Sequence, residues 1–187
     1  MSKDFDKIGK GCAIDKTTSV WKRGNLKESG QIKLGNNVTI FPFCRLVVTS
    51  LDENNHSGII IGDGTYINSH CFLSGEGGLT IGKKCLIAPG VKFVSAGHQV
   101  DDINGLYHTP VISKKILIGD NVWIGAGAII MGGVKIADGS VIGAGSVVTK
   151  DTIPYSVNYG VPSRFIRFRK HQISVLDKFL YFFKFKK

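Results

Sequence analysis

The sequence predicts an all-β chain folded as a parallel β-helix, and two observations lead to this prediction. From residue 118 to residue 148 an aliphatic side chain recurs at every sixth position: Ile118, Ile124, Ile130, Ile136, Ile142 and Val148. Four positions after the first five of these the residue is small or β-branched: Val122, Ala128, Val134, Ser140 and Ser146. A period of six fits neither an α-helix nor simple alternation. One short strand and one turn per hexad instead bring the chain, after three hexads, about 4.8 Å above its starting point.

The chain before residue 118 repeats the pattern with interruptions, so we expect about six coils in total. The aliphatic positions of these earlier coils are Ile8, Ile14 and Val20; Leu34, Ile40 and Leu46; Ile61, Ile67 and Leu73; and Ile81, Ile87 and Phe93. The position four residues after each holds only Cys, Thr, Gly, Val, Ser or Ala, which indicates a tight inward site. We predict that residues 21–33 are irregular and that the polar segment 51–58 is a surface loop.

The period breaks after Phe93 and returns at Ile118. We therefore predict a protruding loop near residues 98–115, and a polar excursion of this kind in a regular solenoid is more often functional than idle. It is the first place to look for catalytic residues.

The chain divides into a solenoid domain over residues 1–170 and a basic amphipathic C-terminal helix over residues 171–187. The helix is predicted from apolar residues at helical spacing: Ile173, Leu176, Phe179, Leu180 and Phe183. It either folds back to cap the last coil, which we favour, or lies against an anionic membrane surface. The sequence has no apolar run long enough to span a membrane and no apolar stretch at its start, which predicts a cytoplasmic protein, with peripheral contact at the inner membrane face as the alternative.

Composition supports one domain and limits the function classes. The chain has 187 residues, 43% of them hydrophobic, which suits a single continuous core. Its four cysteines contain no CxxC pair and each lies four residues after a repeating aliphatic, so we interpret them as reduced core residues. From Arg164 onward there are eight Lys or Arg against one Asp, so much of the net charge of +10 belongs to the tail, and no nucleic-acid-binding motif accompanies it.

Three segments carry a resemblance to a known family: IGDNVWIGAGAII, VIGAGSVVTKD and GVPSRFIR. Together with the hexads they resemble the hexapeptide-repeat acyltransferases, most closely the branch that includes the galactoside and maltose O-acetyltransferases. The resemblance covers roughly residues 59–167. It implies a left-handed helix, a homotrimer, acetyl-CoA as acyl donor, a sugar or glycan acceptor, and no metal.

The resemblance also implies roles for two polar residues. His98, in SAGHQVDD, corresponds to the catalytic histidine of the family, which takes the proton of the attacking hydroxyl. Asn68, in YINSH, corresponds to an acceptor-binding asparagine that orients a sugar hydroxyl; a turn-capping Asn is the alternative. His70 departs from the asparagine that is common at its position.

The remaining implied residues would bind the cofactor. The resemblance places Trp123 and Ala126 beside the thioester and pantetheine, with a backbone N–H near Ala126 as donor to the oxyanion. It places Ala144 along the arm, and it assigns four residues to the phosphate and adenine end: Thr149, Lys150, Arg164 and Arg167. Corner packing for Trp123 and a solvated basic tail for the two arginines are the alternatives.

Other function classes remain open at this point. The first is a zinc lyase of the γ-carbonic anhydrase type, whose paired histidines have no counterpart in the spacing of His56, His70, His98, His108 and His171. The second is a scaffold or binding module without catalysis. Within the transferases, the acceptor could be a bacterial surface glycan or its precursor, a free galactoside, an amino sugar acetylated on nitrogen, or an amino acid.

Overall fold

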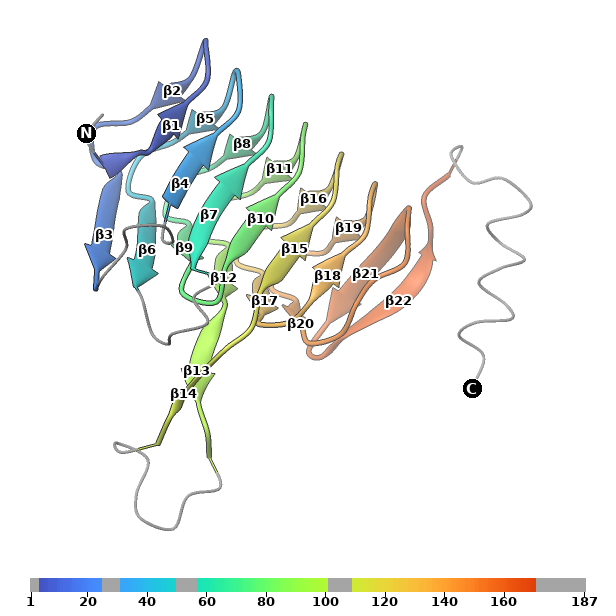
Figure 1. The fold of residues 1–187 in the computed structure, drawn as a ribbon. Coiled ribbons are helices and arrows are strands. Elements are labelled where there is room, and N and C mark those ends of the chain that lie inside the picture. Colours follow the sequence, from blue (N-terminus) through green and yellow to red (C-terminus); the bar gives the residue numbers. More distant parts are fainter. Residues whose placement is uncertain (1–3, 25–30, 50–56, 101–108, 171–187) are drawn as a thin grey trace.

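The structure is a computed structural model and describes residues 4–24, 31–49, 57–100 and 109–170. Its strands stack in rows from the N-terminal end (blue) to the C-terminal end (red), as Figure 1 shows. The rows form three sheets, which we call faces A, B and C. The chain runs from A to B to C and back to A, and we name the turns between faces corners AB, BC and CA.

Face A contains β1 (Lys7–Ile8), β4 (Gln31–Leu34), β7 (Gly58–Ile61), β10 (Leu79–Ile81), β15 (Ile116–Ile118) and β18 (Lys135–Ile136). Face B contains β2 (Ala13–Ile14), β5 (Thr39–Ile40), β8 (Tyr66–Ile67), β11 (Leu86–Ile87), β16 (Trp123–Ile124), β19 (Val141–Ile142), β21 (Ser156–Gly160) and β22 (Ser163–Phe168). Face C contains β3 (Ser19–Arg23), β6 (Arg45–Thr49), β9 (Phe72–Ser74), β12 (Lys92–Val94), β17 (Ile129–Met131) and β20 (Val147–Val148). Apart from β21 and β22, neighbouring strands within these faces are parallel, which confirms the all-β solenoid.

The repeating aliphatics fill the core because each is the inward residue of its short strand. From β4 onward they are almost fully buried, as in the stacked pairs Ile40 with Ile67 and Ile87 with Ile124. In the first coil no further strand stacks outside, and Ile8 remains 40% exposed. The position four residues later is also inward, and Val122, Ala128 and Ser140 are buried there.

The cysteines follow the prediction for reduced core residues. All four are free; Cys44, Cys71 and Cys85 are buried, whereas Cys12 in the first coil is half-buried. Burial raises the pKa of the Cys85 thiol, which therefore stays protonated near neutral pH. The thiols thus act as small apolar fillers.

Corner AB is closed by side chains from the neighbouring coil. The backbone N–H two residues after the aliphatic points outward there, and a carboxylate or amide oxygen of the next coil accepts from it. The pairs are Lys10 with Asn36 (2.9 Å), Asn36 with Asp63 (2.7 Å), Lys83 with Asp120 (2.7 Å) and Asp120 with Asp138 (2.8 Å). This ladder leaves few backbone donors free on this edge.

Two predictions about irregular segments need correction. Residues 21–33 are not irregular throughout, because β3 continues to Arg23 and β4 begins at Gln31. Residues 19–23 pair with all five residues of β6, so backbone hydrogen bonds extend the strand beyond the side-chain period. Of the predicted loop 51–58, residues 51–56 lie outside the described residues, and Gly58 already belongs to β7.

The predicted protruding loop begins as an antiparallel hairpin of β13 (Ala96–His98) and β14 (Val111–Ser113), which projects from the end of β12 (Figure 1). After β20 the chain forms a second hairpin, in which β21 stacks in parallel on β19 and pairs with β22. The predicted helix over 171–187 lies outside the described residues, so its two interpretations stay predictions. In the ranges that are described, no helix has the length and apolarity needed to cross a bilayer.

Candidate active site

His98 is the last residue of β13, at the exposed outer end of the described part of the hairpin. Its Nδ1 is 3.4 Å from the Oγ1 of Thr109, which lies just before the returning strand, and this is a long contact. The imidazole lines a shallow cavity of about 200 Å³ whose walls include Ser95, Lys114 and Met131. An exposed imidazole with one nitrogen held by a hydroxyl can accept a proton from a bound nucleophile.

Corner BC differs from corner AB in its backbone hydrogen bonds. The N–H two residues after the aliphatic belongs to Ala126 in one coil and to Ala144 in the next. Among the described residues neither N–H has a hydrogen-bond partner, although the N–H groups of Gly127 and Gly145 both donate to carbonyls of the preceding coil. Both alanines are exposed. The corner thus offers two open backbone donors at a spacing of one coil.

The sequence explains why these donors stay open. At the same position two other coils have proline, Pro42 and Pro89, which lacks an N–H. In the coil between them, the Ser69 N–H donates to the Asn68 Oδ1 at 2.8 Å. No carboxylate from an adjacent coil reaches this corner in the described residues, in contrast to corner AB. At this corner the amides of Ala126 and Ala144 are thus open in the last two coils, as is the amide of Lys16 in the first coil, whereas the three coils between them have no open donor at this position.

The corner beside these amides carries almost no side-chain bulk. Gly127 and Gly145 have φ of 68° and 66°, and a Cβ added at either would meet no atom within 4 Å. A thin chain can therefore lie against the backbone here without steric conflict.

Asn68 lies on the same corner, in the third coil. Its side-chain oxygen is engaged by Ser69, as the turn-capping alternative requires, and its backbone oxygen accepts from the Cys44 thiol at 3.1 Å. Its amide Nδ2 has no partner within the part of the chain that the structure describes. The two interpretations of Asn68 are therefore compatible, because the oxygen caps the turn while the NH₂ group remains available for a ligand.

Trp123 lies on the outer side of face B and not in a corner turn. It is 53% exposed and sits between Leu86 and Val141 in the ladder of stacked strands. Corner packing therefore does not explain it. The indole forms an apolar surface on face B, beside the part of corner BC that contains Ala126.

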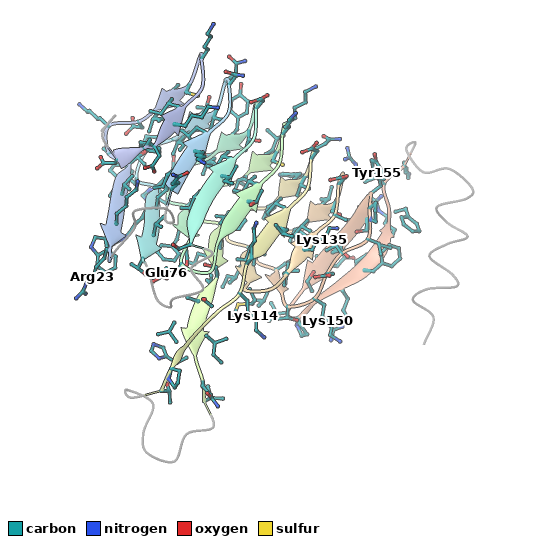
Figure 2. The ribbon with its side chains drawn as sticks, viewed as in Figure 1. Arg23, Glu76, Lys114, Lys135, Lys150 and Tyr155 are labelled. Atoms are coloured by element: carbon teal, nitrogen blue, oxygen red, sulfur yellow. The ribbon has the colours of Figure 1, made fainter. Side chains whose placement is uncertain are left out.

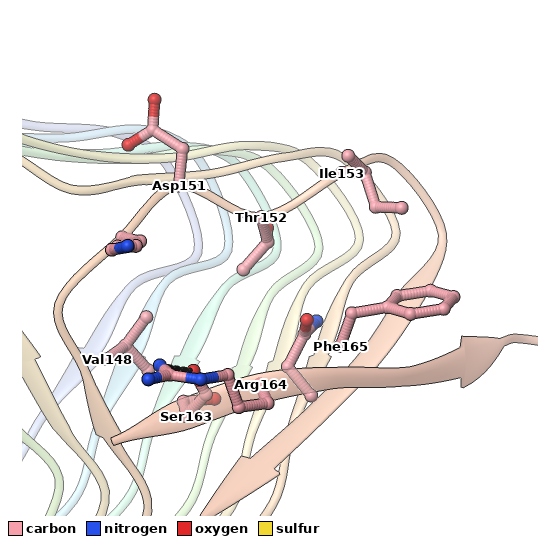
Figure 3. Close-up of a pocket in the computed structure, with 9 residues that line it drawn as sticks. Val148, Asp151, Thr152, Ile153, Ser163, Arg164 and Phe165 are labelled. Atoms are coloured by element: carbon pink, nitrogen blue, oxygen red, sulfur yellow. Dashed lines mark hydrogen bonds between the residues drawn. The ribbon is translucent and has the colours of Figure 1, made fainter. Parts of the chain in front are cut away.

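Lys150 and Arg164 meet at the C-terminal end of the solenoid. Together with Val148, Asp151, Ser163 and Phe165 they line a cavity of about 240 Å³ between the exit segment and β22 (Figure 3). The Ser163 Oγ is buried there without a hydrogen-bond partner. A buried hydroxyl that lacks a partner and faces a cavity with two cations can hydrogen-bond a polar ligand.

Two predicted residues do not line this cavity. Thr149 is exposed just before it, and the guanidinium of Arg167 donates to the Phe168 carbonyl at 3.0 Å. Arg164 itself donates to the Ser163 carbonyl at 3.1 Å, the contact drawn in Figure 3. The basic end is thus formed chiefly by Lys150 and Arg164.

The predicted residues fall on two separate edges of the solenoid. Asn68, Ala126 and Ala144 lie at corner BC, before the strands of face C, whereas His98 and Lys150 follow those strands at corner CA. Figure 2 shows this second edge through its labelled residues Glu76, Lys114 and Lys150. A strand of three residues spans about 10 Å. One chain therefore does not bring His98 to the open amides.

Corner CA also contains a polar cluster that the sequence prediction missed. The half-buried Glu76 carboxylate accepts from Thr49 (2.9 Å) and Ser74 (3.1 Å), and Ser74 lies 2.8 Å from the Ser95 Oγ at the root of the hairpin. The sequence signal for this cluster is a serine at each of two repeat positions: Ser74 directly follows Leu73, and Ser95 lies two residues after Phe93. Most coils have glycine or an apolar residue at these positions. No group of three potential metal ligands occurs in the described ranges.

Comparison with known proteins places the solenoid in a family. Residues 115–150 match the model described as bacterial transferase hexapeptide (six repeats). Galactoside O-acetyltransferase from Escherichia coli K12 is 39% identical over 134 residues, which are 70% of this chain and 62% of that enzyme. The match therefore spans less than two thirds of the length of this relative.

Two solved structures extend the match. A maltose O-acetyltransferase from Clostridium difficile 630 is 34% identical, with a TM-score of 0.62 over 72% of this chain and 67% of that one. The N-acyltransferase AntD from Bacillus cereus, in complex with dTDP and 3-hydroxybutyryl-CoA, is 28% identical, with a TM-score of 0.76 over 97% of this chain and 93% of that one. These matches confirm the resemblance carried by the three sequence segments.

Proposed function

This chain belongs to the hexapeptide-repeat transferase family, and from that premise we propose that it transfers an acetyl group from acetyl-CoA to a sugar hydroxyl. The observation that carries the proposal is the pair of open N–H groups of Ala126 and Ala144 on a corner without side-chain bulk. Pantetheine is a thin chain with amide carbonyls, so such a ridge suits it. Lys150 and Arg164, which line the cavity at the C-terminal end of the solenoid, supply the positive charge that phosphates require.

In the proposed reaction the acceptor hydroxyl attacks the thioester carbonyl carbon while His98 takes its proton. The C–O bond forms, the carbonyl oxygen becomes an oxyanion, and the Ala126 N–H donates to it. The oxyanion then collapses, the C–S bond breaks, and the proton passes from His98 to the departing thiolate. No acyl-enzyme is needed, which agrees with the inward placement of Cys44, Cys71 and Cys85.

The separation of the two edges supports a site shared between copies. We propose a homotrimer in which the hairpin with His98 of one copy faces corner BC of its neighbour. The exposed position of His98 and of Ala126 fits this arrangement, because both groups are directed away from their own chain.

The acceptor is proposed to be a bacterial surface glycan or its precursor, with Asn68 orienting the attacking sugar. A second candidate is transfer to nitrogen of an amino sugar. It is favoured by the fold match to the N-acyltransferase AntD over 97% of this chain. The chemistry at His98 is the same in both cases, since an amine also loses a proton as it attacks.

An acceptor panel with proline variants tests the proposal. Thiol release from acetyl-CoA is measured with methyl β-galactoside, maltose and dTDP-4-amino-4,6-dideoxyglucose. Because Pro42 and Pro89 already occupy this turn position, Ala126→Pro removes an N–H while keeping the fold. We expect kcat to fall by about 10² or more, as on loss of one oxyanion donor, with an unchanged melting temperature.

Ala126→Gly is the matched control, since it keeps the N–H and should retain most of the activity. Full activity of Ala126→Pro would exclude this amide as the donor. An absence of acetyl-CoA binding by the wild type would instead favour the scaffold alternative.

A further inference from the structure

Two side-chain rings lie at corner BC near Asn68, one in the preceding coil and one in the same coil. Phe43 and His70 stack with centroids 5.0 Å apart and an angle of 20° between their planes. They belong to successive coils, joined by a hydrogen bond from the His70 N–H to the Pro42 carbonyl. Phe43 is 58% exposed and His70 is exposed as well.

Both residues adopt a backbone conformation that disfavours a side chain. Phe43 has φ of 62° and His70 has φ of 61°. The following coils have glycine at the equivalent position: Gly90, Gly127 and Gly145. A left-handed conformation is unusual for a residue with a Cβ, and above all for a bulky aromatic one. Backbone strain of this kind clusters at sites where the side chain has a function.

The stack leaves one face of His70 uncovered. Its centroid distance to Phe43 is close to the spacing between coils, about 4.8 Å, so the rings stack along the solenoid axis. Phe43 covers one face of the imidazole and the other is turned toward the next coil. Gly90 occupies the equivalent position of that coil, and a Cβ added to it would meet only backbone atoms of Gly127, at 3.9 Å. The space over Gly90, beside the uncovered face of His70, is therefore free of side chains among the described residues, and we call it the slot.

We propose that this slot binds a sugar ring of the acceptor, which stacks its apolar CH face on His70 with Phe43 behind it. The inference rests on the proposed function and adds the residues that select the acceptor. A pyranose combines a flat apolar face with polar groups on its rim, which suits an aromatic surface beside a hydrogen-bonding group. The free Nδ2 of Asn68 lies two residues before His70 on the same corner and can hydrogen-bond a rim hydroxyl.

Two substitutions change the slot in opposite ways without straining the turn. His70→Gly removes the wall and places glycine in a left-handed position. Gly90→Asn fills the slot, and asparagine tolerates this conformation, as Asn37 and Asn121 show at corner AB. The control is Gly64→Asn, the same change at corner AB, where φ is 67°.

The measurement is KM for the acceptor and for acetyl-CoA, together with the melting temperature. Both slot variants should raise the acceptor KM by about three- to tenfold while the acetyl-CoA KM stays within about twofold. His70→Gly should melt at the same or a higher temperature, which separates loss of the ring from loss of the fold. An unchanged acceptor KM in both variants, or an equal rise in Gly64→Asn, would overturn the proposal.

A binding experiment distinguishes the failure of this inference from the failure of the proposed function. If the wild type acetylates none of the panel sugars, the proposed function fails, and saturation-transfer NMR with maltose and methyl β-galactoside then decides the inference. Transfer to the sugar ring protons in the wild type, lost in His70→Gly, supports the slot. Equal transfer in both proteins, or none in either, overturns it.

Discussion

At the scale of single residues, the two exposed edges present different chemical groups. Corner BC presents backbone donors, because Ala126 and Ala144 leave their N–H groups open. Corner CA presents side chains, among them the His98 imidazole and the Lys150 ammonium. An acyl transfer requires both kinds of group, since the oxyanion needs donors and the nucleophile needs a base.

His98→Ala tests the proposed base. The imidazole is exposed, and within the described ranges its one hydrogen-bond contact is the long one to Thr109, so its removal should not disturb the solenoid. We expect kcat to fall by roughly 10² or more while the dissociation constant of acetyl-CoA stays unchanged, measured by steady-state kinetics and calorimetry. More than about a tenth of wild-type kcat would show that another group accepts the proton.

At the scale of the coil, each hexad has two inward positions with different size limits. The aliphatic position takes Leu, Ile, Val or Phe, whereas the position four residues later is confined by the turn; Ala128 is 0% exposed there. The structure confirms that pattern of small residues. It also explains the exposed first coil, where Ile8 has no outer neighbour.

Ala128→Phe should overpack this turn and lower the free energy of unfolding by about 1 to 3 kcal/mol or more. Cys71→Ala is the comparison at the equivalent position of another coil, and it removes only a buried thiol that donates to the Ala88 carbonyl at 3.3 Å. We expect a much smaller loss for Cys71→Ala in urea unfolding. Equal losses would mean that the inward positions are wrongly assigned.

The strands could be predicted from the sequence because the hexad period and the burial of the aliphatics have the same physical cause. The end of β3 and the start of β4 could not be predicted, since backbone pairing of β3 with β6 and of β4 with β7 extends these strands where the side-chain period has stopped. The stacking of Phe43 on His70 could not be predicted from the sequence either. These residues are 27 positions apart, and only the spacing of coils brings their rings to 5.0 Å.

The sequence predicted which residues belong to the candidate site but not how they are arranged in space. The family resemblance indicated His98, Asn68 and Ala126, but the sequence did not show that face C separates the first from the other two. The Glu76 cluster was missed because its partners, Thr49 and Ser95, come from different coils.

At the scale of the whole molecule, each end of the described solenoid has strands whose outer edge lacks a paired neighbour. In the described residues face A ends at β18 and face C at β20, whereas β21 and β22 continue face B. Removing residues 172–187 should lower the melting temperature if this segment covers those edges. An unchanged melting temperature combined with lost binding to anionic vesicles would support membrane contact instead.

The shared site is the central claim, and a mixed oligomer tests it most directly. His98→Ala and Ala126→Pro are co-expressed with different tags, and oligomers that contain both chains are isolated. Each variant alone should be nearly inactive. In the isolated mixed trimers, one site in three combines an intact His98 from one chain with an intact Ala126 from the other, which should restore about a third of wild-type kcat. Mixed oligomers as inactive as either variant alone, or a fully active monomer by light scattering, would contradict a site formed between copies.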